Sequence, residues 1–458
     1  MTVSISTLLV LGASGDMASR LLLPALGQLL TEHPERQLRL IGAGSDDVSH
    51  QDWIARITAS FAAADAKGSA IKNLLASTVY HRADVTVTAE MKRLLAECEG
   101  TPAIYFALPP AVTTLVCDAL ASVDLPAGTQ LALEKPFGAD EESAADLNAQ
   151  LAKLVTEEQI HRVDHFLGLS TVLNLLGLRF ANRIFEPLWN SEHIKRVDIV
   201  YDEELGLEGR AGYYDHAGAL VDMIQSHLLQ VMSIFAMEPP ATLGAADLRD
   251  AKGIVLRATR VRGGSAKRSS RRGRYTAGTI EGRKLPDYLD EPGVEASNGT
   301  ETLAEVTFEI DNWRWKGVPF TLRSGKALGV RRREIVVTFK DVPHLPTGLT
   351  ELEKPTILRI LLAPDEMSLE LNINGPGDPY NIGRVNLDAS FGPGQFLAYG
   401  EVLEGILEGD PSLSVRGDTA KQCWHIVAPV LKAWKDGKVP LEDYPAGSRG
   451  PQDWPSLG

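Results

Sequence analysis

The sequence predicts two domains: a Rossmann-like, doubly wound α/β domain over residues 1–165 and an α+β domain with a large, mostly antiparallel sheet over residues 166–458. The chain of 458 residues is too long for one ordinary core, because a domain usually holds about 100–200 residues. In the first part, short apolar runs alternate with helical patterns, which is typical of parallel strands joined by helices. After about residue 180 the segments alternate in polarity at hairpin-like spacing, which indicates an antiparallel sheet.

The first domain is predicted from four apolar, strand-like runs. The run at 7–11 leads through a glycine-containing turn into a helical pattern over 17–30. Further strand-like runs follow at 37–44, 103–110 and 130–138, with helix-like segments between them. Strands and helices in this alternation favour a parallel, doubly wound sheet.

The second domain is predicted from segments with a period-two alternation of polar and apolar residues. These strand-like segments are 196–205, 253–261, 303–310, 319–325, 334–340 and 358–364. Helical patterns lie at 218–237 and 423–434. The cationic segment 260–274 is rich in Gly and Ser, which predicts a mobile surface loop, with an anion site as the alternative.

Composition excludes several classes of function. The net charge of −14 argues against a nucleic-acid partner, which requires a cationic surface. No stretch approaches the roughly 20 continuous apolar residues of a membrane helix, and the first residues show no signal-peptide pattern, so we expect a soluble, cytoplasmic protein. Cys98, Cys117 and Cys423 are isolated, which fits a reducing compartment and provides no metal-ligand spacing, so no metal is expected.

A glycine-rich turn after the first strand predicts a nucleotide site, with a purely structural turn as the alternative. Residues 12–18 fit a G-x-x-G-x-x-A pattern. Gly12 permits the tight turn, Gly15 lets a pyrophosphate approach the backbone, and the following helix offers free N–H groups. The predicted cofactor contacts are Gly12, Ser14, Gly15, Asp16, Met17, Ser45, Asp46, Pro109 and Lys135.

The end of the second strand predicts which dinucleotide is preferred. A cation there meets the 2′-phosphate of NADP, whereas a carboxylate meets the free ribose hydroxyl of NAD. Residues 42–47 include Ser45, Asp46 and Asp47 and no arginine or lysine. We therefore expect NAD or NADP as the cofactor, with NAD favoured. The alternative is that the two aspartates only cap the next helix.

Several ordered motifs, taken together, resemble one family. Besides the turn, they are 134–138 (EKPFG), 162–168 (RVDHFLG), 212–215 (GYYD), 222–230 (DMIQSHLLQ) and 323–326 (RSGK). Shorter motifs accompany them at 179–182, 185–190, 236–240 and 312–320. In order and spacing, from about residue 7 to about residue 435, the chain resembles the glucose-6-phosphate dehydrogenase family.

The resemblance implies oxidation of a hexopyranose at C1 to the 1,5-lactone, with hydride transfer to NAD(P). His227 matches the family's general base and Asp164 its carboxylate partner. An imidazole suits this task at neutral pH, and a carboxylate behind it stabilises the imidazolium. Lys135 precedes Pro136, at a peptide that is often cis in the family, and matches a catalytic residue that binds both cofactor and sugar.

The resemblance also implies the remaining substrate contacts and the assembly. The substrate-binding positions are Lys135, His165, Glu203, Asp215, His227, Lys326 and Arg331. Family members are usually dimers or tetramers, so a homodimer or homotetramer is expected.

The phosphate-binding motif departs from the family pattern. The family reads D-H-Y-L-G-K, whereas residues 164–169 read DHFLGL, so Phe166 lacks a hydroxyl and Leu169 lacks a charge. Hydrogen bonds to charged groups are worth about 1.5–3 kcal/mol each, so phosphate binding is weakened unless another cation compensates. Three interpretations follow. They are a glucose-6-phosphate dehydrogenase that uses His165, Arg331 or a cation of 260–274, a hexose 1-dehydrogenase for a sugar with no or another 6-substituent, and a non-catalytic cofactor-binding regulator.

Overall fold

The computed structural model describes residues 5–349, 354–374, 380–392, 394–455 and 457. The chain forms two compact units, neither of which is continuous in sequence. Unit 1 comprises Met1–Leu169, Pro240–Ala251 and Gly394–Gln422, and unit 2 comprises Ser170–Pro239, Lys252–Pro393 and Cys423–Gly458. The sequence placed 240–251 and 394–422 in the second domain, whereas the structure assigns both segments to unit 1.

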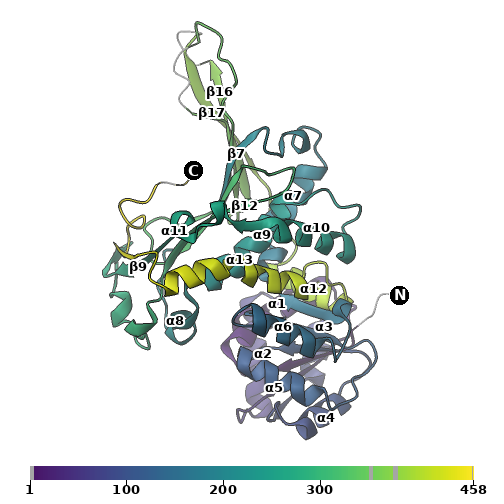
Figure 1. The fold of residues 1–458 in the computed structure, drawn as a ribbon. Coiled ribbons are helices and arrows are strands. Elements are labelled where there is room, and N and C mark those ends of the chain that lie inside the picture. Colours follow the sequence, from purple (N-terminus) through teal and green to yellow (C-terminus); the bar gives the residue numbers. More distant parts are fainter. Residues whose placement is uncertain (1–4, 350–353, 375–379, 393, 456, 458) are drawn as a thin grey trace. The chain divides into compact units, whose positions relative to one another are not determined.

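Unit 1 contains a parallel six-stranded sheet with associated helices (Figure 1). The strand order is β3-β2-β1-β4-β5-β6 and every pairing is parallel. The strands are β1 Thr7–Leu11, β2 Arg39–Gly44, β3 Val79–Arg82, β4 Pro102–Phe106, β5 Gln130–Glu134 and β6 Ile160–Val163. The order reverses beside β1, which is where doubly wound sheets bind ligands. The Rossmann-like prediction is confirmed, although it missed the short strands β3 and β6.

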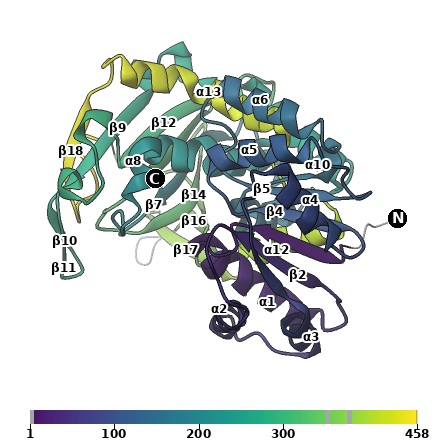
Figure 2. The same ribbon diagram turned by 90° about the horizontal axis from the view of Figure 1, so that it is seen from below.

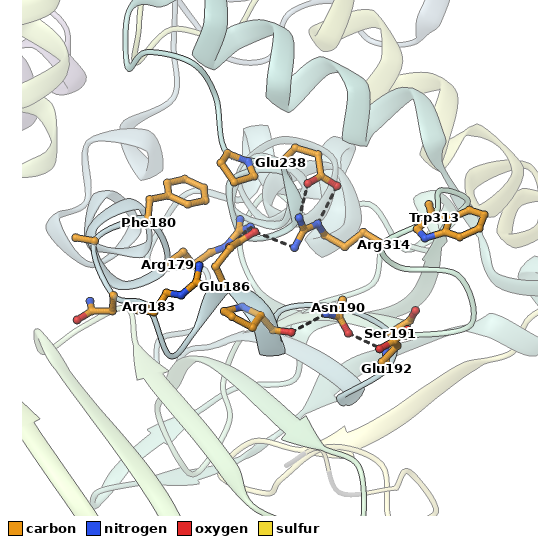
Figure 3. Close-up of a pocket in the computed structure, with 14 residues that line it drawn as sticks. Arg179, Phe180, Arg183, Glu186, Asn190, Ser191, Glu192, Glu238, Trp313 and Arg314 are labelled. Atoms are coloured by element: carbon orange, nitrogen blue, oxygen red, sulfur yellow. Dashed lines mark hydrogen bonds and ion pairs between the residues drawn. The ribbon is translucent and has the colours of Figure 1, made fainter.

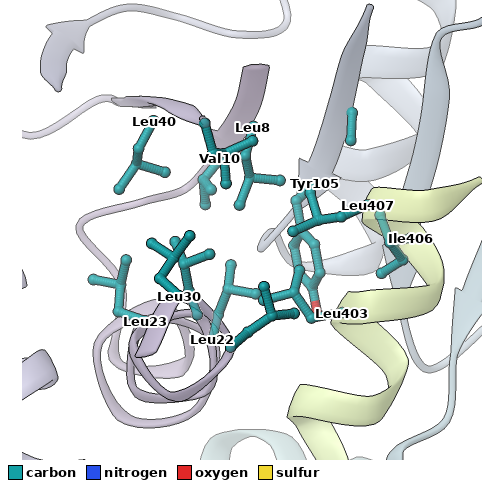
Figure 4. Packing of buried hydrophobic residues seen from close by; sticks show 14 of the residues in the cluster. Leu8, Val10, Leu22, Leu23, Leu30, Leu40, Tyr105, Leu403, Ile406 and Leu407 are labelled. Atoms are coloured by element: carbon teal, nitrogen blue, oxygen red, sulfur yellow. The ribbon is translucent and has the colours of Figure 1, made fainter. Parts of the chain in front are cut away.

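The core of unit 1 explains why a late segment of the chain belongs to it. The helices are η1 Ala18–Leu22, α1 Leu23–Glu32, α2 His50–Ala63, α3 Ser69–Ser77, α4 Thr88–Ala96, α5 Pro110–Leu120, α6 Glu141–Leu151, η3 His165–Gly168 and α12 Ala398–Glu408. Leu8 of β1 and Leu30 of α1 share a buried cluster with Leu403 and Ile406 of α12 (Figure 4). Each fully buried side chain of this kind contributes about 1.5–3 kcal/mol, so α12 is anchored in unit 1.

Unit 2 is built on a 10-stranded mixed sheet with the order β17-β16-β15-β14-β7-β13-β12-β9-β18, and β8 beside β12. The strands are β7 Ile194–Asp202, β8 Thr259–Val261, β9 Ser270–Thr276, β12 Leu303–Ile310, β13 Pro319–Gly325, β14 Arg332–Phe339, β15 Ile357–Leu361, β16 Glu366–Asn374, β17 Ile382–Ser390 and β18 Leu441–Pro445. Among the strands that the structure describes, only β7–β13 and β9–β18 pair in parallel, so the predicted, mostly antiparallel sheet is confirmed. β16 and β17 extend beyond the rest of this sheet (Figure 1).

The remaining elements of the second half include several helices and one separate hairpin. The helices are α7 Ser170–Phe180, α8 Ala211–Ala219, η5 Leu220–Leu228, α9 Leu229–Ala236, α10 Ala245–Ala258, α11 Ala266–Ser269 and α13 Gly417–Lys435. The hairpin of β10 Gly278–Ile280 and β11 Arg283–Leu285 forms its own sheet and lies at the margin of unit 2 (Figure 2).

Two sequence predictions in this half are wrong. The predicted strand at 253–261 is helical up to Ala258, and only Thr259–Val261 form a strand. The helix starts upstream in a segment rich in Ala, Leu, Arg and Lys, whose helix propensity extends through the apolar run. The predicted mobile loop at 260–274 contains α11 and β9 instead. Two of its cations have partners for their side chains: Arg260 bonds Glu309, and Arg272 donates to backbone carbonyls.

The predicted helix at 218–237 consists of three segments. Gly218 interrupts it with a φ of +66°, which an L-residue with a side chain rarely adopts. The backbone N–H of Leu220 donates to the Glu301 carboxylate at 2.9 Å, and η5 then continues as a π-helix. The stretch Ala211–Ala236 is apolar and long enough to cross a membrane, but 89% of its 18-residue apolar window is buried within the protein. This burial is typical of a core helix.

Candidate active site

The predicted site residues are distributed over both units. The nucleotide turn (residues 12–17), Ser45, Asp46, Pro109, Lys135, Asp164 and His165 lie in unit 1. Glu203, Asp215, His227, Lys326 and Arg331 lie in unit 2. The nucleotide turn in unit 1 is formed mainly by backbone atoms, whereas the site residues in unit 2 contribute side chains.

The nucleotide turn is built from backbone held in one conformation. Gly12 has a φ of +80°, and a Cβ there would lie 2.2 Å from the Ala107 carbonyl oxygen. The N–H of Gly12 donates to the Ala43 carbonyl at 2.7 Å, which ties the turn to β2. Gly15 and Asp16 are exposed just before η1. The turn therefore presents side-chain-free backbone and a helix N-terminus, which fits a pyrophosphate.

The end of β2 has a cationic neighbour that the local sequence does not reveal. Gly44 pairs in register with Arg82, the last residue of β3. Nη1 of Arg82 lies 3.9 Å from the Asp47 carboxylate, and both side chains are exposed. The Tyr80 hydroxyl donates to the Asp46 carbonyl at 3.2 Å. The premise that no cation lies near Ser45 is therefore wrong, because the adjacent strand brings one.

Lys135 follows β5, and its peptide bond to Pro136 is cis, as the resemblance implied. The preceding Glu134 accepts a hydrogen bond from the Tyr105 hydroxyl at 2.5 Å. Burial raises the pKa of Glu134 to about 7, although Tyr105 and the Lys135 ammonium act against this shift. Pro109 caps the start of α5, where its carbonyl accepts from two amides of the first turn. Glu134 thus titrates beside a predicted catalytic lysine.

Asp164 and His165 are fixed by short-range contacts at the end of β6. The buried Asp164 carboxylate accepts from the Phe166 N–H at 3.0 Å and caps η3. The His165 ring stacks on Tyr399 of α12, with centroids 5.1 Å apart and an interplanar angle of 14°. Phe166 is buried, and Leu169 is half-exposed. Tyr399 was not predicted, because it comes from a segment distant in sequence.

His227 lies near the end of the π-helical segment η5 and is buried. Glu301 holds the first amide of this segment, and Gly218 provides the kink that precedes it. π-Helical segments are rare and frequently occur at functional sites. The imidazole is therefore carried by a π-helical segment that follows a kink at Gly218. A regular α-helical sequence pattern does not predict this geometry.

Three charged side chains meet where β7, β13 and β14 approach one another in unit 2. The Glu203 carboxylate accepts from Lys326 Nζ at 2.9 Å and from an Arg333 Nη at 3.0 Å. The Arg333 guanidinium carbon lies 4.5 Å above the Tyr201 ring. Burial raises the pKa of Tyr201, and the positive charges of Arg333 and Arg331 oppose that shift.

A cavity of about 500 Å³ is lined by the four consecutive charged residues 331–334 together with Leu361, Ala363 and Pro364. We call Glu203, Lys326, Arg331 and Arg333 the strand-end cluster. Arg333 was missed in the sequence, because only the pairing of β14 with β7 brings it to Tyr201. The positive charges of Arg333 and of Arg331, which directly precedes β14, both act on Tyr201.

Asp215 is buried in unit 2 and accepts several hydrogen bonds. Its carboxylate accepts from the Tyr288 hydroxyl at 2.6 Å, the Glu295 N–H at 2.9 Å and the Asn298 amide at 2.7 Å. Burial opposes ionisation of Asp215, but these hydrogen bonds outweigh it and lower its pKa. These contacts give Asp215 a role in ordering residues 288–298.

A larger cavity of about 860 Å³ contains none of the predicted site residues (Figure 3). Most of its lining comes from the short motifs at 179–182, 185–190, 236–240 and 312–320, and Arg183, Ser191 and Glu192 complete it. The Arg314 guanidinium lies between Glu238 and Glu186, and Arg179 bonds Glu186 at 3.1 Å (Figure 3). These motifs therefore build an ion-paired support between α7 and the loop before β13.

Models of one family match both halves of the chain. The NAD-binding domain model of glucose-6-phosphate dehydrogenase matches residues 9–174, and the C-terminal domain model matches residues 176–457. Among curated proteins, a glucose-6-phosphate 1-dehydrogenase of Rhizobium meliloti is 38% identical, with 96% of this chain and 94% of that one covered.

Solved structures agree with the sequence comparison. A glucose-6-phosphate 1-dehydrogenase from Mycobacterium avium is similar with a TM-score of 0.85 and 34% identity, covering 99% of this chain and 96% of that one. A glucose-6-phosphate dehydrogenase in complex with its substrate glucose 6-phosphate is similar with a TM-score of 0.87 and 29% identity, covering 99% and 97%.

Proposed function

The chain belongs to the glucose-6-phosphate dehydrogenase family, and we propose that it oxidises glucose 6-phosphate at C1 to the 1,5-lactone. The observation that supports this most is the full-length similarity to relatives of that activity, one of them with glucose 6-phosphate bound. The chain also retains the nucleotide turn, Lys135, Asp164 and His227 at the matching positions.

The proposed roles of the side chains follow from the reaction. A bound nicotinamide supplies the hydride acceptor. His227 removes the proton of the C1 hydroxyl while the hydride leaves C1, which turns the C–O bond into the lactone carbonyl. Asp164 stabilises the imidazolium that forms, and Lys135 binds the sugar hydroxyls. A positioned base of this kind contributes about 10²–10⁴-fold to the rate.

We further propose that the enzyme uses NAD in preference to NADP. The supporting feature is the pair of exposed aspartates, Asp46 and Asp47, after β2. Arg82 carries the opposite charge, but its nearest acid is Asp47 at 3.9 Å. Part of its attraction for a 2′-phosphate is therefore offset, and we expect a moderate preference. The ratio of kcat/KM for the two coenzymes measures it.

We also propose that the protein is a homodimer that uses one face of the large sheet. Charges alternate along this face: Arg359 of β15 bonds Glu334 of β14 at 3.2 Å and Glu370 of β16 at 2.7 Å, and Arg384 of β17 bonds Glu370 at 2.8 Å. In a two-fold dimer the same patch of each subunit faces its copy. A patch that carries both positive and negative charges can therefore pair with itself. Sedimentation over a range of protein and salt concentrations tests this assembly.

A second candidate function is oxidation of a hexose without a 6-phosphate. The observation in its favour is the loss of two phosphate contacts at Phe166 and Leu169. Formation of the reduced coenzyme should be followed with glucose 6-phosphate, glucose and other 6-substituted hexoses, each with NAD and NADP. We expect kcat/KM to be highest for glucose 6-phosphate by several orders of magnitude. Equal values for glucose and its phosphate would replace the first function with the second.

A further inference from the structure

We infer that residues 444–454, called segment 444–454 below, position the Lys326 loop of the substrate site, with Tyr444 fixing the backbone of Lys326 and Trp454 holding the segment in place. The inference rests on the proposed function, because Lys326 is a proposed contact of the sugar. The segment begins in β18 and lies beyond the residues that carried the family resemblance. Tyr444 and Trp454 are positioning residues, which act on the sugar only through Lys326.

The loop that carries Lys326 has a backbone conformation that depends on its neighbours. Ala327 has a φ of +53°, which residues with a side chain rarely adopt and which persists only where surrounding contacts hold it. On one side of the loop, the N–H of Ala327 donates to the Leu205 carbonyl at 2.8 Å. The next N–H, of Leu328, donates to the Glu203 carbonyl at 2.9 Å. Segment 444–454 supplies the contacts on the other side.

Tyr444 fixes the backbone of Lys326 through a chain of hydrogen bonds whose directions are determined. Tyr444 is fully buried, and its hydroxyl lies 2.7 Å from the Lys326 carbonyl and 2.8 Å from the Thr302 hydroxyl. A carbonyl only accepts, so the one proton of the Tyr444 hydroxyl points to Lys326 and the Thr302 hydroxyl donates to the Tyr444 oxygen. The Thr302 hydroxyl oxygen accepts in turn from the Tyr275 N–H at 2.9 Å. Because the Lys326 N–H also donates to the Thr302 carbonyl at 2.9 Å, both polar groups of the Lys326 backbone are held.

The backbones of segment 444–454 and of the Lys326 loop approach each other too closely for side chains. The N–H of Gly447 donates to the Ala327 carbonyl at 2.9 Å. The N–H of Gly329 donates to the Ser448 carbonyl at 2.8 Å, and a Cβ on Gly329 would lie 2.0 Å from the Gly447 carbonyl oxygen. Glycine is therefore required at this contact. A shift of the segment must move the loop with it.

Trp454 holds the far end of segment 444–454 on the large sheet. Its indole N–H donates to the Glu442 carboxylate at 3.0 Å. The guanidinium carbons of Arg271 and Arg323 each lie 5.9 Å from the centroid of the Trp454 ring, within the range of a cation–π contact. An Nη of Arg323 also donates to the Arg449 carbonyl at 2.8 Å. These contacts tie the segment to β9, β13 and β18, so loss of the indole should release it.

The position of the Lys326 backbone decides where its ammonium lies. Lys326 Nζ is 2.9 Å from the Glu203 carboxylate and 5.2 Å from the centroid of the Tyr214 ring. These two neighbours fix the side chain once the backbone is fixed. Hydrogen bonds of a charged donor depend on geometry, and a misplacement of about 1 Å can cost about 10²-fold in rate. Movement of the segment should therefore weaken sugar binding without altering the reacting groups.

The first test compares two buried tyrosines of neighbouring strands. Tyr444→Phe removes the hydroxyl that bonds Lys326, which should raise KM for glucose 6-phosphate about tenfold while kcat stays within about threefold. Tyr275→Phe also removes a buried hydroxyl, which bonds Glu291 at 3.0 Å, but it keeps the backbone N–H that bonds Thr302. It should therefore keep the KM of the wild type. Equal rises of KM in the two variants would indicate general destabilisation and overturn the inference.

The second test compares two tryptophans of the same unit. Trp454→Ala should raise KM about tenfold, and Trp454→Phe should raise it less, because phenylalanine keeps a ring beside the guanidinium groups. Trp313→Ala removes a fully exposed tryptophan and should match the wild type. In the double variant of Tyr444→Phe and Trp454→Ala, the rise of KM should be smaller than the product of the single rises, because both act through one segment. Fully multiplied effects would contradict this shared route.

Hydrogen exchange separates the inference from the proposed function, because it requires neither substrate nor turnover. In the substrate-free enzyme, the amides of Ala327 and Gly329 should exchange at least tenfold faster in Trp454→Ala than in the wild type or in Trp313→Ala. The inference is overturned if the three proteins exchange equally, or if exchange rises in Trp454→Ala while its KM stays at the wild-type value. A wild type that does not oxidise glucose 6-phosphate would refute the proposed function, whereas the exchange rates would still decide whether the segment holds the loop.

Discussion

The nucleotide turn of unit 1 and the strand-end cluster of unit 2 are built from different atoms. The turn consists of backbone, with a glycine at a φ of +80° and no room for a side chain beside Ala107. The cluster consists of charged side chains at the ends of three strands, with Lys326 and Arg333 both bonded to Glu203. The stability of a site made of backbone should fall when a side chain is enlarged and should change little when a charge is removed. A site made of paired charges should lose stability or activity when a charge is removed and should tolerate small changes in volume.

The largest effect is expected where a single ionisable side chain acts chemically. His227→Asn removes the proposed base and should lower kcat by about 10³-fold, within the range for general base catalysis. The affinity for the reduced coenzyme, measured by fluorescence, should change little. The exposed His193 provides a control, since His193→Asn should retain wild-type turnover. Equal losses in both variants would indicate general destabilisation.

Adding one carbon to the nucleotide turn tests its dependence on volume. Gly12→Ala places a Cβ 2.2 Å from the Ala107 carbonyl oxygen at a positive φ. We expect the free energy of unfolding to fall by about 3 kcal/mol, from strain and steric conflict combined. Asp16→Asn changes only charge at an exposed position of the same turn and should cost no more than about 0.5 kcal/mol. Urea denaturation compares the two, and similar costs would contradict the distinction drawn above.

The free energy of unfolding should depend on pH through a buried glutamate of unit 2, Glu301. Burial raises the pKa of Glu301 to about 7, although the Leu220 and neighbouring amides oppose the shift. In the unfolded chain a glutamate titrates near 4.3. Between these values the folded protein retains a proton that the unfolded chain has released. The free energy of unfolding therefore falls as pH rises through this window.

Glu301→Gln should remove this contribution. The variant should match the wild type near pH 4.5 and become relatively more stable by about 2 kcal/mol at pH 8, from about 1.4 kcal/mol per pKa unit and partial relaxation. Denaturation at several pH values measures the slope. Glu281→Gln, at an exposed position, should leave the slope unchanged. A slope that persists in Glu301→Gln would assign it to other buried acids, such as Asp198 and Glu305, whose pKa values burial raises to about 6.

The smallest effect is expected from a charge beside the nucleotide site. Arg82→Gln should lower kcat/KM for NADP by about fivefold, or about 1 kcal/mol, and leave that for NAD within about twofold. The reason is that Arg82 is exposed and shares its charge with Asp47, and exposed pairs contribute little. Arg93→Gln, on α4, is a control in the same unit. An equal change for both coenzymes would remove Arg82 from coenzyme recognition.

The sequence predicts the part of the site that is formed by consecutive residues better than the part that is assembled from distant segments. The nucleotide turn lies within seven consecutive residues, and its glycines have a local steric reason, so the pattern alone locates it. The cis peptide before Pro136 was likewise implied at the matching position. Arg82 was missed because only strand pairing brings it beside Gly44. Tyr399 was missed because its contact with His165 joins segments far apart in the chain.

Two local predictions were wrong because contacts with distant charged residues determine the local structure. The segment 260–274 looks like a loop by composition, yet cross-strand partners order it as α11 and β9. The helix that carries His227 follows an apolar helical pattern, but Gly218 and Glu301 convert its middle into a π-helix. In both cases a contact from a distant part of the chain contributes, which local periodicity does not contain.

The most direct test of the central claim is to follow the hydrogen at C1. Glucose 6-phosphate labelled with deuterium at C1 is incubated with the enzyme and oxidised coenzyme, and the reduced coenzyme is analysed by mass spectrometry and NMR. If the chain oxidises C1 by hydride transfer, the deuterium is recovered at C4 of the reduced nicotinamide ring. Deuterium that remains in the sugar while the coenzyme is reduced, or that is released into water, would contradict the assignment.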